Sequence, residues 1–322
     1  MQKSSCLMLT WYAALVLVAA CAEAREDPTP DPSNPGTTIV LGENGKALDR
    51  AILSASSGDF SGVILVAQGG EVLLHKGYGL AHRDSGRPNA PLTVFDSGSL
   101  AKPFTAVAVL QLVDAGKLAL NDTLADHFPG VTHDKSSITI HQLLTHTSGL
   151  DAFHGGDFSE ISKEKALETI LNARPVAAPG LEFRYSNSGY TLLAAIIEKV
   201  SALSWTEYLR THIFEPAAMK HTGFYGDKSF REVGVASAYD NKGRDRRSPL
   251  TWPGPSWGLI GNGGLVTNTE DLFRWHQALQ DGTLLTVQGL TSLYTPQECT
   301  KPFLPGNYEG IRALRDSIRS SY

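Results

Sequence analysis

The sequence predicts a fold that mixes strands and helices, α/β in class, because it combines a strand–turn–strand pattern near the start of the chain with a long, mainly helical region. Residues 62–68 and 71–78 are rich in Val, Leu and Ile and flank the turn Gly69-Gly70, which is the pattern of a β-hairpin. Residues 104–113 form an almost wholly apolar run that indicates a buried helix. Further helical periods lie at residues 46–54, 162–173, 190–200 and 270–279.

The composition is that of an ordinary globular protein, and it narrows the partners that we expect. The chain has 322 residues, a formal net charge of −5 and 42% hydrophobic residues, which suits one large domain or two small ones. No basic stripe suggests nucleic-acid binding, so we expect a small-molecule or peptide substrate and no nucleic acid. No metal or other cofactor is expected, and the composition does not determine the oligomeric state.

Residues 1–21 are expected to be a signal peptide with a lipobox. Lys3 precedes an apolar stretch from Leu7 to Ala20 that is short for a permanent membrane anchor. The stretch ends in Val18-Ala19-Ala20-Cys21, which resembles a bacterial lipobox, so Cys21 is the expected lipidation site. A lipoprotein on the periplasmic side of the outer membrane, with the lipid as its membrane anchor, is therefore expected. Cleavage after Ala24, which would give a soluble secreted protein, is the alternative.

Residues 22–42 are expected to be a disordered linker, and residues 43–322 the folded domain. The linker begins with an acidic, proline-rich stretch that cannot bury apolar area and favours an extended tether. After removal of the signal peptide, Cys21 and Cys299 are the remaining thiols. We therefore expect no disulfide framework.

Ser99 and Lys102 are the strongest candidates for chemistry. A serine hydroxyl is a poor nucleophile at neutral pH and needs a base beside it, and a lysine three residues later lies on the same helix face. The phenol of Tyr185, far downstream, can complete a proton relay, as in S-x-x-K serine hydrolases. The residues alone equally allow Ser99 to cap the helix while Lys102 extends its ammonium group to solvent.

Other serine motifs are interpreted as structural. A second S-x-x-K begins at Ser162, where charged neighbours indicate a helix N-cap and solvent-exposed lysines. Residues 254–258 match the G-x-S-x-G nucleophile elbow around Ser256, but nearby prolines and glycines do not favour the strand and helix that an elbow requires. Asp271 and His276 could complete a triad with that serine, but we expect them on the polar side of an amphipathic helix.

The histidines do not indicate a metal site. His141 and His146 flank a Leu-Leu pair without a third clustered ligand. His146 is expected to fix a loop through hydrogen bonds. His154 begins a triplet with the composition H-x-G, but it precedes Tyr185 and is interpreted as part of a flexible surface loop.

Several blocks resemble the serine β-lactamase and penicillin-recognising family, particularly the class C branch with the related D-alanyl-D-alanine carboxypeptidases and esterases. The resemblance extends from about Gly58 to Gly282. The blocks occur in the order of the family: residues 98–106, 143–150, 179–180, 183–190, 213–216, Met219, 222–224 and 263–267.

The resemblance implies an antiparallel sheet flanked by helices, with a helical lobe opposite and the cleft between them. It implies that Ser99 is the acylated nucleophile and Lys102 its base or proton-relay partner. Tyr185 would be the general base or the proton donor to the leaving group, and Asn187 would orient the substrate amide or Lys102. The expected reaction is hydrolysis of a β-lactam, a D-alanyl peptide or a small ester. The alternative is a catalytically degenerate, surface-tethered homologue that binds cell-wall peptide or a partner.

The third element of the family, K-T-G or H-x-G on a strand after the tyrosine motif, is expected to be missing. The chain contains no K-T-G, and after about residue 282 we expect it to be truncated or divergent, without the C-terminal strands. The resemblance implies that this element supplies a cleft wall and a second oxyanion donor. Because losing one such donor lowers a rate by about 10²–10³-fold, we expect a weak catalyst with an exposed hairpin edge.

Overall fold

The computed structural model describes residues 19–20, 36–55, 60–231, 233–240, 243–245 and 248–295. The predicted lipidation site Cys21, most of the signal segment and residues 296–322 lie outside these ranges. Within the described ranges, no helix combines the length and the hydrophobicity needed to cross a bilayer.

The predicted hairpin forms the centre of the four-stranded sheet of the molecule. Strands β3 (Phe60–Gln68) and β4 (Glu71–Tyr78) pair antiparallel from Gly62 with Tyr78 to Gln68 with Glu71, with a bulge at Val66 and Ala67. The short strands β1 (Ala19–Ala20) and β2 (Ile39–Val40) extend this sheet to the order β1-β3-β4-β2. Because β2 pairs with β4, the ordered domain begins inside the linker that we expected to reach residue 42.

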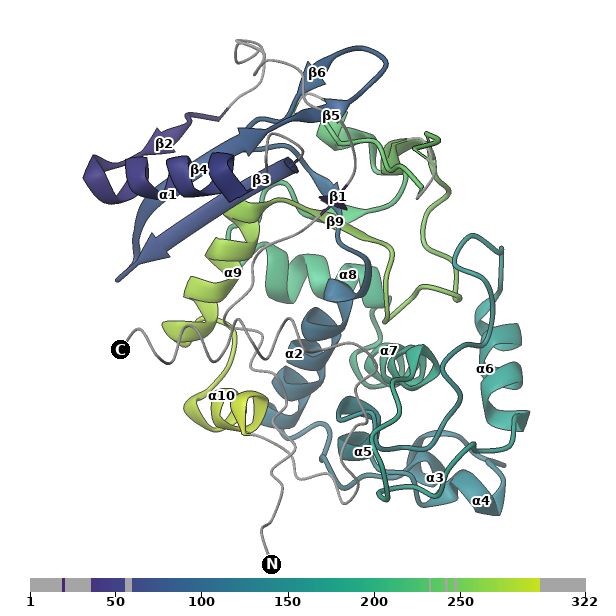
Figure 1. Cartoon of the computed structure of the whole chain (residues 1–322). Coiled ribbons are helices and arrows are strands. Elements are labelled where there is room, and N and C mark those ends of the chain that lie inside the picture. The colour runs from purple at the N-terminus through teal and green to yellow at the C-terminus, as the bar shows by residue number, and fades with distance from the viewer. Residues whose placement is uncertain are drawn as a thin grey trace, which may run out of the picture.

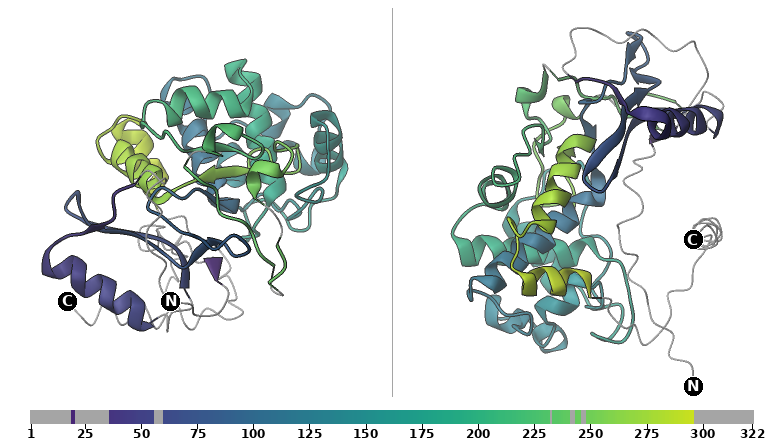
Figure 2. Two further views of the ribbon diagram at one scale, coloured as in Figure 1. Left: turned by 90° about the horizontal axis from the view of Figure 1, so that it is seen from above. Right: turned by 90° about the vertical axis from the view of Figure 1, so that its left-hand side faces the viewer.

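Helices cover both faces of this sheet. Helix α1 (Gly42–Ala55) lies against β4 on one face, and α9 (Thr269–Gln280) lies against β3 on the other (Figures 1 and 2). A buried histidine links the sheet to α9, because His75 Nε2 lies 3.0 Å from both Pro91 O and Thr269 Oγ1. The arrangement is the flanked antiparallel sheet that the sequence predicts.

Two smaller sheets connect the hairpin to the rest of the molecule. Strands β5 (Leu80–His82) and β6 (Arg87–Pro88) form a second hairpin. In the other sheet, β9 (Leu265–Thr267) lies between β7 (Phe95–Asp96) and β8 (Gly223–Phe224). This sheet brings the segment before Ser99 beside residues that lie about 170 positions later, since Phe95 pairs with Thr267.

Helix α2 (Ala101–Asp114) is the central helix of the opposite lobe, and nine of its residues are buried. It packs against α7 (Asn187–Ser201), α8 (Trp205–Leu209) and α10 (Val287–Tyr294), as Figure 1 shows. The remaining α-helices of the described ranges are α3 (Leu124–His127), α4 (His133–Ser136), α5 (Ile140–Leu144) and α6 (Lys163–Asn172). Four short helical segments complete the elements: η1 (Gly98–Leu100), η2 (Arg210–Phe214), η3 (Lys228–Arg231) and η4 (Pro249–Thr251).

One expectation about α9 is wrong. Asp271 is fully buried rather than solvent-facing, and its Oδ2 accepts hydrogen bonds from Thr222 Oγ1 at 2.8 Å and from the His221 N–H at 2.6 Å. The first turn of α9 contacts His221 and Thr222, just before β8, and a carboxylate near a helix N-terminus is favourable there. Asp271 therefore ties α9 to the segment that leads into β8.

Candidate active site

Ser99 lies in the turn that connects β7 to α2. Gly98 has a φ of +50°, which favours glycine, and η1 leads from it into the helix. Ser99 is exposed. Helix α2 has Leu100 at its N-cap and no side-chain cap. Ser99 therefore does not serve as the helix cap, and its hydroxyl is accessible for chemistry.

Lys102 is buried directly beneath this hydroxyl. Its side chain is 4% exposed, so it does not reach solvent. Its Nζ lies 3.1 Å from Ser99 Oγ and 2.9 Å from Asn262 O, and it lies 4.7 Å from the ring centroid of Tyr185. Burial lowers the pKa of Lys102 to about 7, with Asp157 acting weakly in the opposite direction. The amine is therefore poised to hold or release a proton near neutral pH.

Tyr185 reaches the same hydroxyl from the segment before α7. Its phenol donates a hydrogen bond of 2.8 Å to Ser99 Oγ. Burial raises the pKa of Tyr185, although the hydrogen bond with Ser99 acts against that shift. At neutral pH the phenol is therefore protonated and acts as a hydrogen-bond donor.

Asn187, the fourth predicted site residue, is the first residue of α7. Its backbone N–H donates to Ala152 O at 2.9 Å. Its side-chain Oδ1 is buried and has no hydrogen-bond partner among the described residues. Among the described residues, Lys102 Nζ makes its hydrogen bonds with Ser99 Oγ and Asn262 O and none with Asn187.

Two residues of the site were missed by the sequence analysis. Asn262 lies in a glycine-rich segment, and its side-chain amide donates to Thr191 Oγ1 at 3.0 Å and to Gly258 O at 3.1 Å, which fixes the carbonyl group that Lys102 contacts. Asp96 Oδ1 accepts the Gly98 N–H at 2.9 Å and the Tyr225 hydroxyl at 2.7 Å. The glycines around Asn262 were visible in the sequence, but nothing in it indicated either contact.

The competing serines are structural, as expected. Ser162 is the N-cap of α6 and accepts the Lys165 N–H at 3.2 Å, although Lys163 is half-buried and pairs with Glu198. Ser256 lies in an irregular segment, and its Oγ donates to Ser159 O at 2.6 Å. The described residues around Ser256 form neither the strand nor the helix of a nucleophile elbow.

His154 is better ordered than the expected surface loop. Its Nδ1 lies 3.2 Å from Ser188 Oγ and its Nε2 lies 2.8 Å from Trp257 O. These contacts fasten the segment after Leu150 to α7 and to the segment around Trp257. Both ring nitrogens have partners, so His154 is a structural residue here.

The expectation that no H-x-G follows Tyr185 overlooked the triplet His221-Thr222-Gly223. Thr222 is buried, and its hydroxyl lies 2.7 Å from Thr267 Oγ1 and 2.8 Å from Asp271 Oδ2. Gly223 belongs to β8, beneath Phe230. The triplet is part of the packing between the start of β8 and α9, and no hydrogen bond among the described residues joins it to Ser99.

Among the described residues, one group of potential metal ligands lies on the β5–β6 hairpin and a neighbouring segment; His82 is half-buried and the two carboxylates are exposed. The ligand atoms of His82, Asp84 and Asp245 lie within 4.8 Å of one another. His82 Nδ1 lies 2.7 Å from Ser85 Oγ and accepts the Ser85 N–H at 3.2 Å, which leaves Nε2 as the more available ligand atom.

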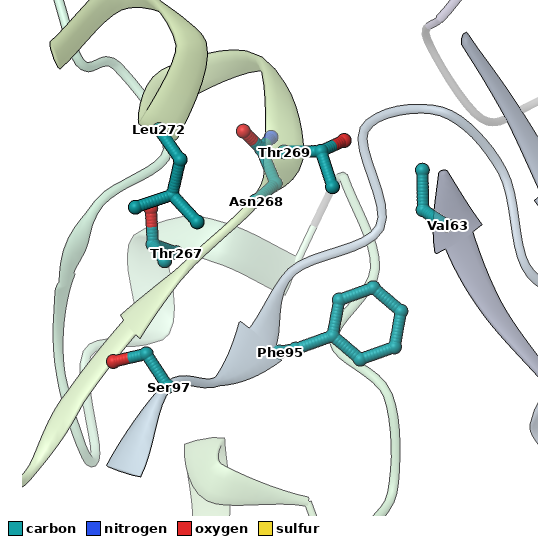
Figure 3. A pocket seen from close by; sticks show the side chains of 7 residues that line it. All are labelled: Val63, Phe95, Ser97, Thr267, Asn268, Thr269 and Leu272. Carbon is teal, nitrogen blue, oxygen red and sulfur yellow. The ribbon is translucent and has the colours of Figure 1, made fainter. Parts of the chain in front are cut away.

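A small pocket behind β7 is distinct from the Ser99 site. Figure 3 shows side chains from β3, β7, β9 and the start of α9 around a cavity of about 10 Å³, enough for about one water molecule. Its lining includes Ser97, whose Oγ donates to Leu265 O at 2.7 Å, but no titratable residue. It is a packing defect between sheet and helix.

The fold is that of the β-lactamase/transpeptidase-like proteins. The sequence matches the β-lactamase family over residues 48–311, which is most of the chain. The chain therefore belongs to the β-lactamase family. The matched range extends past Gly282, where the blocks recognised in the sequence end.

Similar proteins carry penicillin-binding names. The chain is 34% identical over 238 residues to the putative penicillin-binding protein PbpX of Bacillus subtilis, an alignment that covers 74% of this chain and 59% of PbpX. The octameric penicillin-binding protein homologue from Pyrococcus abyssi superposes with a TM-score of 0.65 and 28% identity, over 77% of this chain and 59% of that one.

A penicillin-binding protein from Bacillus halodurans gives a TM-score of 0.64 at 28% identity, over 77% of this chain and 78% of that one. The chain spans about three fifths of the length of PbpX. These similarities support the fold and the membership of the family.

Proposed function

We propose that this chain hydrolyses a small carbonyl substrate through an acyl-enzyme on Ser99. The observation that supports this most directly is that Ser99 Oγ has two titratable partners, Lys102 Nζ at 3.1 Å and Tyr185 Oη at 2.8 Å. An exposed serine with an adjacent base is the arrangement that activates a nucleophile. Membership of the β-lactamase family supports a hydrolase, and both the activity of this chain and its covalent mechanism are our proposal.

Lys102 is the better candidate for the first proton acceptor. Its pKa of about 7 leaves a large neutral fraction at physiological pH, and a neutral amine can accept the Ser99 proton as Oγ attacks the carbonyl carbon. Tyr185, whose pKa is raised, is protonated and suited to pass a proton to the leaving group as the bond to that group breaks. Tyr185 then recovers a proton from the Lys102 ammonium group, so both groups return to their starting states. Water attacks the acyl carbon, one of its protons passes by way of the neutral Lys102 amine to Ser99 Oγ as the ester bond breaks, and its hydroxyl stays on the released acid.

The substrate is proposed to be a β-lactam, a D-alanyl peptide or a small ester, without a cofactor or a nucleic-acid partner. Asn187 begins α7 close to Tyr185, and its buried, unpaired Oδ1 is suited to accept a hydrogen bond from a substrate amide. The PbpX-like relatives are named for penicillin binding, which favours a β-lactam or D-alanyl compound as the first compounds to test.

A chromogenic cephalosporin and a short p-nitrophenyl ester, each compared between the wild-type chain and Ser99→Ala, test this function. We expect turnover or covalent labelling by fluorescent penicillin that is lost in Ser99→Ala. Serine-independent turnover would refute the proposal.

A second candidate is a degenerate homologue that binds cell-wall peptide without turning it over. The absence of K-T-G from the sequence favours it, because that element would supply part of the cleft. Saturable binding of a D-alanyl peptide, unchanged in Ser99→Ala and without labelling by any acylating probe, would support this candidate over the hydrolase.

We also propose that the protein is a lipoprotein on the periplasmic side of a bacterial membrane, anchored through Cys21. The proposal rests on Val18-Ala19-Ala20-Cys21 and the acidic, proline-rich segment after it. Globomycin, which blocks lipoprotein signal peptidase, should cause the unprocessed precursor to accumulate. A soluble mature protein that begins at Arg25 would show instead that an ordinary signal peptidase releases it.

A further inference from the structure

His146 contacts Tyr185 and both of its neighbours in the chain. The main-chain oxygen of His146 accepts the Arg184 N–H at 2.7 Å, and its imidazole Nδ1 accepts the Ser186 N–H at 3.1 Å. The rings of His146 and Tyr185 pack with their centroids 4.6 Å apart and their planes inclined by 30°. One residue therefore binds the backbone on each side of Tyr185 and also covers its ring.

The backbone of His146 adopts a left-handed conformation that makes these contacts possible. Its φ is +57°, a region that non-glycine residues enter rarely and that Asn and His adopt more often than most. The surrounding turn holds this conformation, because the Thr147 N–H donates to Gln142 O at 2.9 Å and the Gly180 N–H donates to Thr147 O at 2.7 Å. An uncommon conformation that persists under such constraint is typical of functional sites.

The imidazole is neutral in this position. Nδ1 accepts a backbone N–H, so it carries no proton, and the remaining proton of the neutral ring lies on Nε2. The side chain is 8% exposed. Burial, together with the nearby Lys102 ammonium, lowers the pKa of His146 to about 3. A protonated ring would lose the hydrogen bond from Ser186 and would repel Lys102.

We propose that His146 is a positioning residue that holds the Tyr185 phenol against Ser99 Oγ, an inference that rests on the proposed role of Tyr185 in acyl transfer. Tyr185 is 40% exposed, so the surrounding protein covers only part of its side chain. Its backbone is held on both sides by the hydrogen bonds of Arg184 and Ser186 with His146. Among the described residues, the hydrogen bonds of His146 go to Arg184 and Ser186 and not to Ser99 or Lys102, so we infer that it acts through Tyr185.

Two substitutions separate the contributions of His146. His146→Asn keeps an acceptor for the Ser186 N–H and tolerates the positive φ, but it removes the ring that packs on Tyr185. His146→Phe keeps a ring but removes the acceptor. His141→Asn, the same change five positions earlier on α5, is the matched control. Thermal unfolding and circular dichroism establish that each variant is folded.

The kinetic test is a double-mutant cycle with Tyr185→Phe. We expect His146→Asn and His146→Phe to lower kcat on a p-nitrophenyl ester by about 10- to 100-fold with KM nearly unchanged, since small displacements of a catalytic group have effects of this size. In the Tyr185→Phe background the same changes should add less than about twofold, because the hydroxyl that they position is gone. Equal losses in both backgrounds would overturn the proposal.

A second readout does not require turnover. With ¹³C-labelled tyrosine, and with the Tyr185 resonance assigned through Tyr185→Phe, the phenol pKa should fall toward the ordinary value of about 10 in His146→Asn. It should remain at the wild-type value in His141→Asn. If the wild-type chain shows no serine-dependent turnover, the proposed hydrolase function fails, and this titration still decides the positioning role. A Tyr185 titration identical in wild type and His146→Asn would overturn it.

Discussion

Tyr185 donates a hydrogen bond of 2.8 Å to Ser99 Oγ, although 86 positions separate the two residues in the sequence. The contact joins the turn before α2 to the segment before α7, the two helices that form the centre of the helical lobe. Lys102 reaches the same oxygen from within α2. The hydroxyl of Ser99 is therefore in contact with a protonated phenol and with a weakly basic amine at the same time.

Tyr185→Phe should lower the rate of acylation by about 10²-fold, because it removes the proposed proton donor to the leaving group. The ring remains, with its packing against His146, so we expect the midpoint of thermal unfolding to change little. Stopped-flow labelling with a fluorescent penicillin measures the rate. A labelling rate equal to that of the wild type would show that the phenol takes no part in acylation.

The rate of acylation should rise with pH and level off above about 7, since neutral Lys102 is the proposed base and its pKa is about 7. Lys102→Arg keeps a positive charge at every accessible pH and cannot act as that base. The pH profile of labelling, measured for both proteins, tests this. A flat wild-type profile between pH 5.5 and 9, or an active Lys102→Arg variant, would assign the base to another group.

Burial of Lys102 should also make stability depend on pH. Its pKa falls from 10.5 in the unfolded chain to about 7 in the folded protein, so between these values the unfolded chain binds more protons and stability rises with pH. The free energy of unfolding of Lys102→Met, relative to that of the wild type, should therefore be highest at and below pH 7. That advantage should shrink by about 3 kcal/mol as the pH rises to 9.5.

Urea unfolding of the wild type and Lys102→Met gives the difference in their free energies of unfolding, once at pH 7 and once at pH 9.5. Other ionisations change both proteins alike, so the comparison isolates Lys102. A difference in the free energy of unfolding that does not vary with pH would show that Lys102 keeps an ordinary pKa.

Asp96 should support the turn that carries the nucleophile. Asp96→Ala removes the acceptor of the Gly98 N–H and leaves the Tyr225 hydroxyl without its partner. We expect a destabilisation of about 2 kcal/mol and slower labelling of Ser99 by about tenfold. Tyr225→Phe is the control, because it keeps the hydrogen bond from the Gly98 N–H to Asp96 Oδ1. Wild-type labelling by Asp96→Ala, with slow labelling by Tyr225→Phe, would contradict this role.

Regular elements with a strong periodic pattern were predictable from the sequence. The hairpin and the apolar helix after Ser99 occur where the pattern indicates, and the helical periods near residues 162–173 and 270–279 are α6 and α9. The spacing of Ser99 and Lys102 was informative for the same reason, because residues three apart near the start of a helix share a side.

Contacts between distant segments were not predictable from periodicity. Tyr185 entered the predicted site by comparison with S-x-x-K serine hydrolases and not through periodicity, and the hydrogen bond between Asp96 and Tyr225 spans 129 positions. Asp271 was misplaced because an amphipathic pattern shows that one face of a helix is polar, but not that a strand covers its first turn. The two hydrogen bonds that His146 accepts depend on a positive φ, which the residue type permits but does not require.

The position of the covalent adduct tests the central claim most directly. After reaction of the full chain with a fluorophosphonate probe, tandem mass spectrometry of the digested protein locates the modified residue. Our account predicts a single adduct on Ser99, absent in Ser99→Ala and formed more slowly in Tyr185→Phe. An adduct on Ser162 or Ser256, or undiminished labelling of Ser99→Ala, would contradict it.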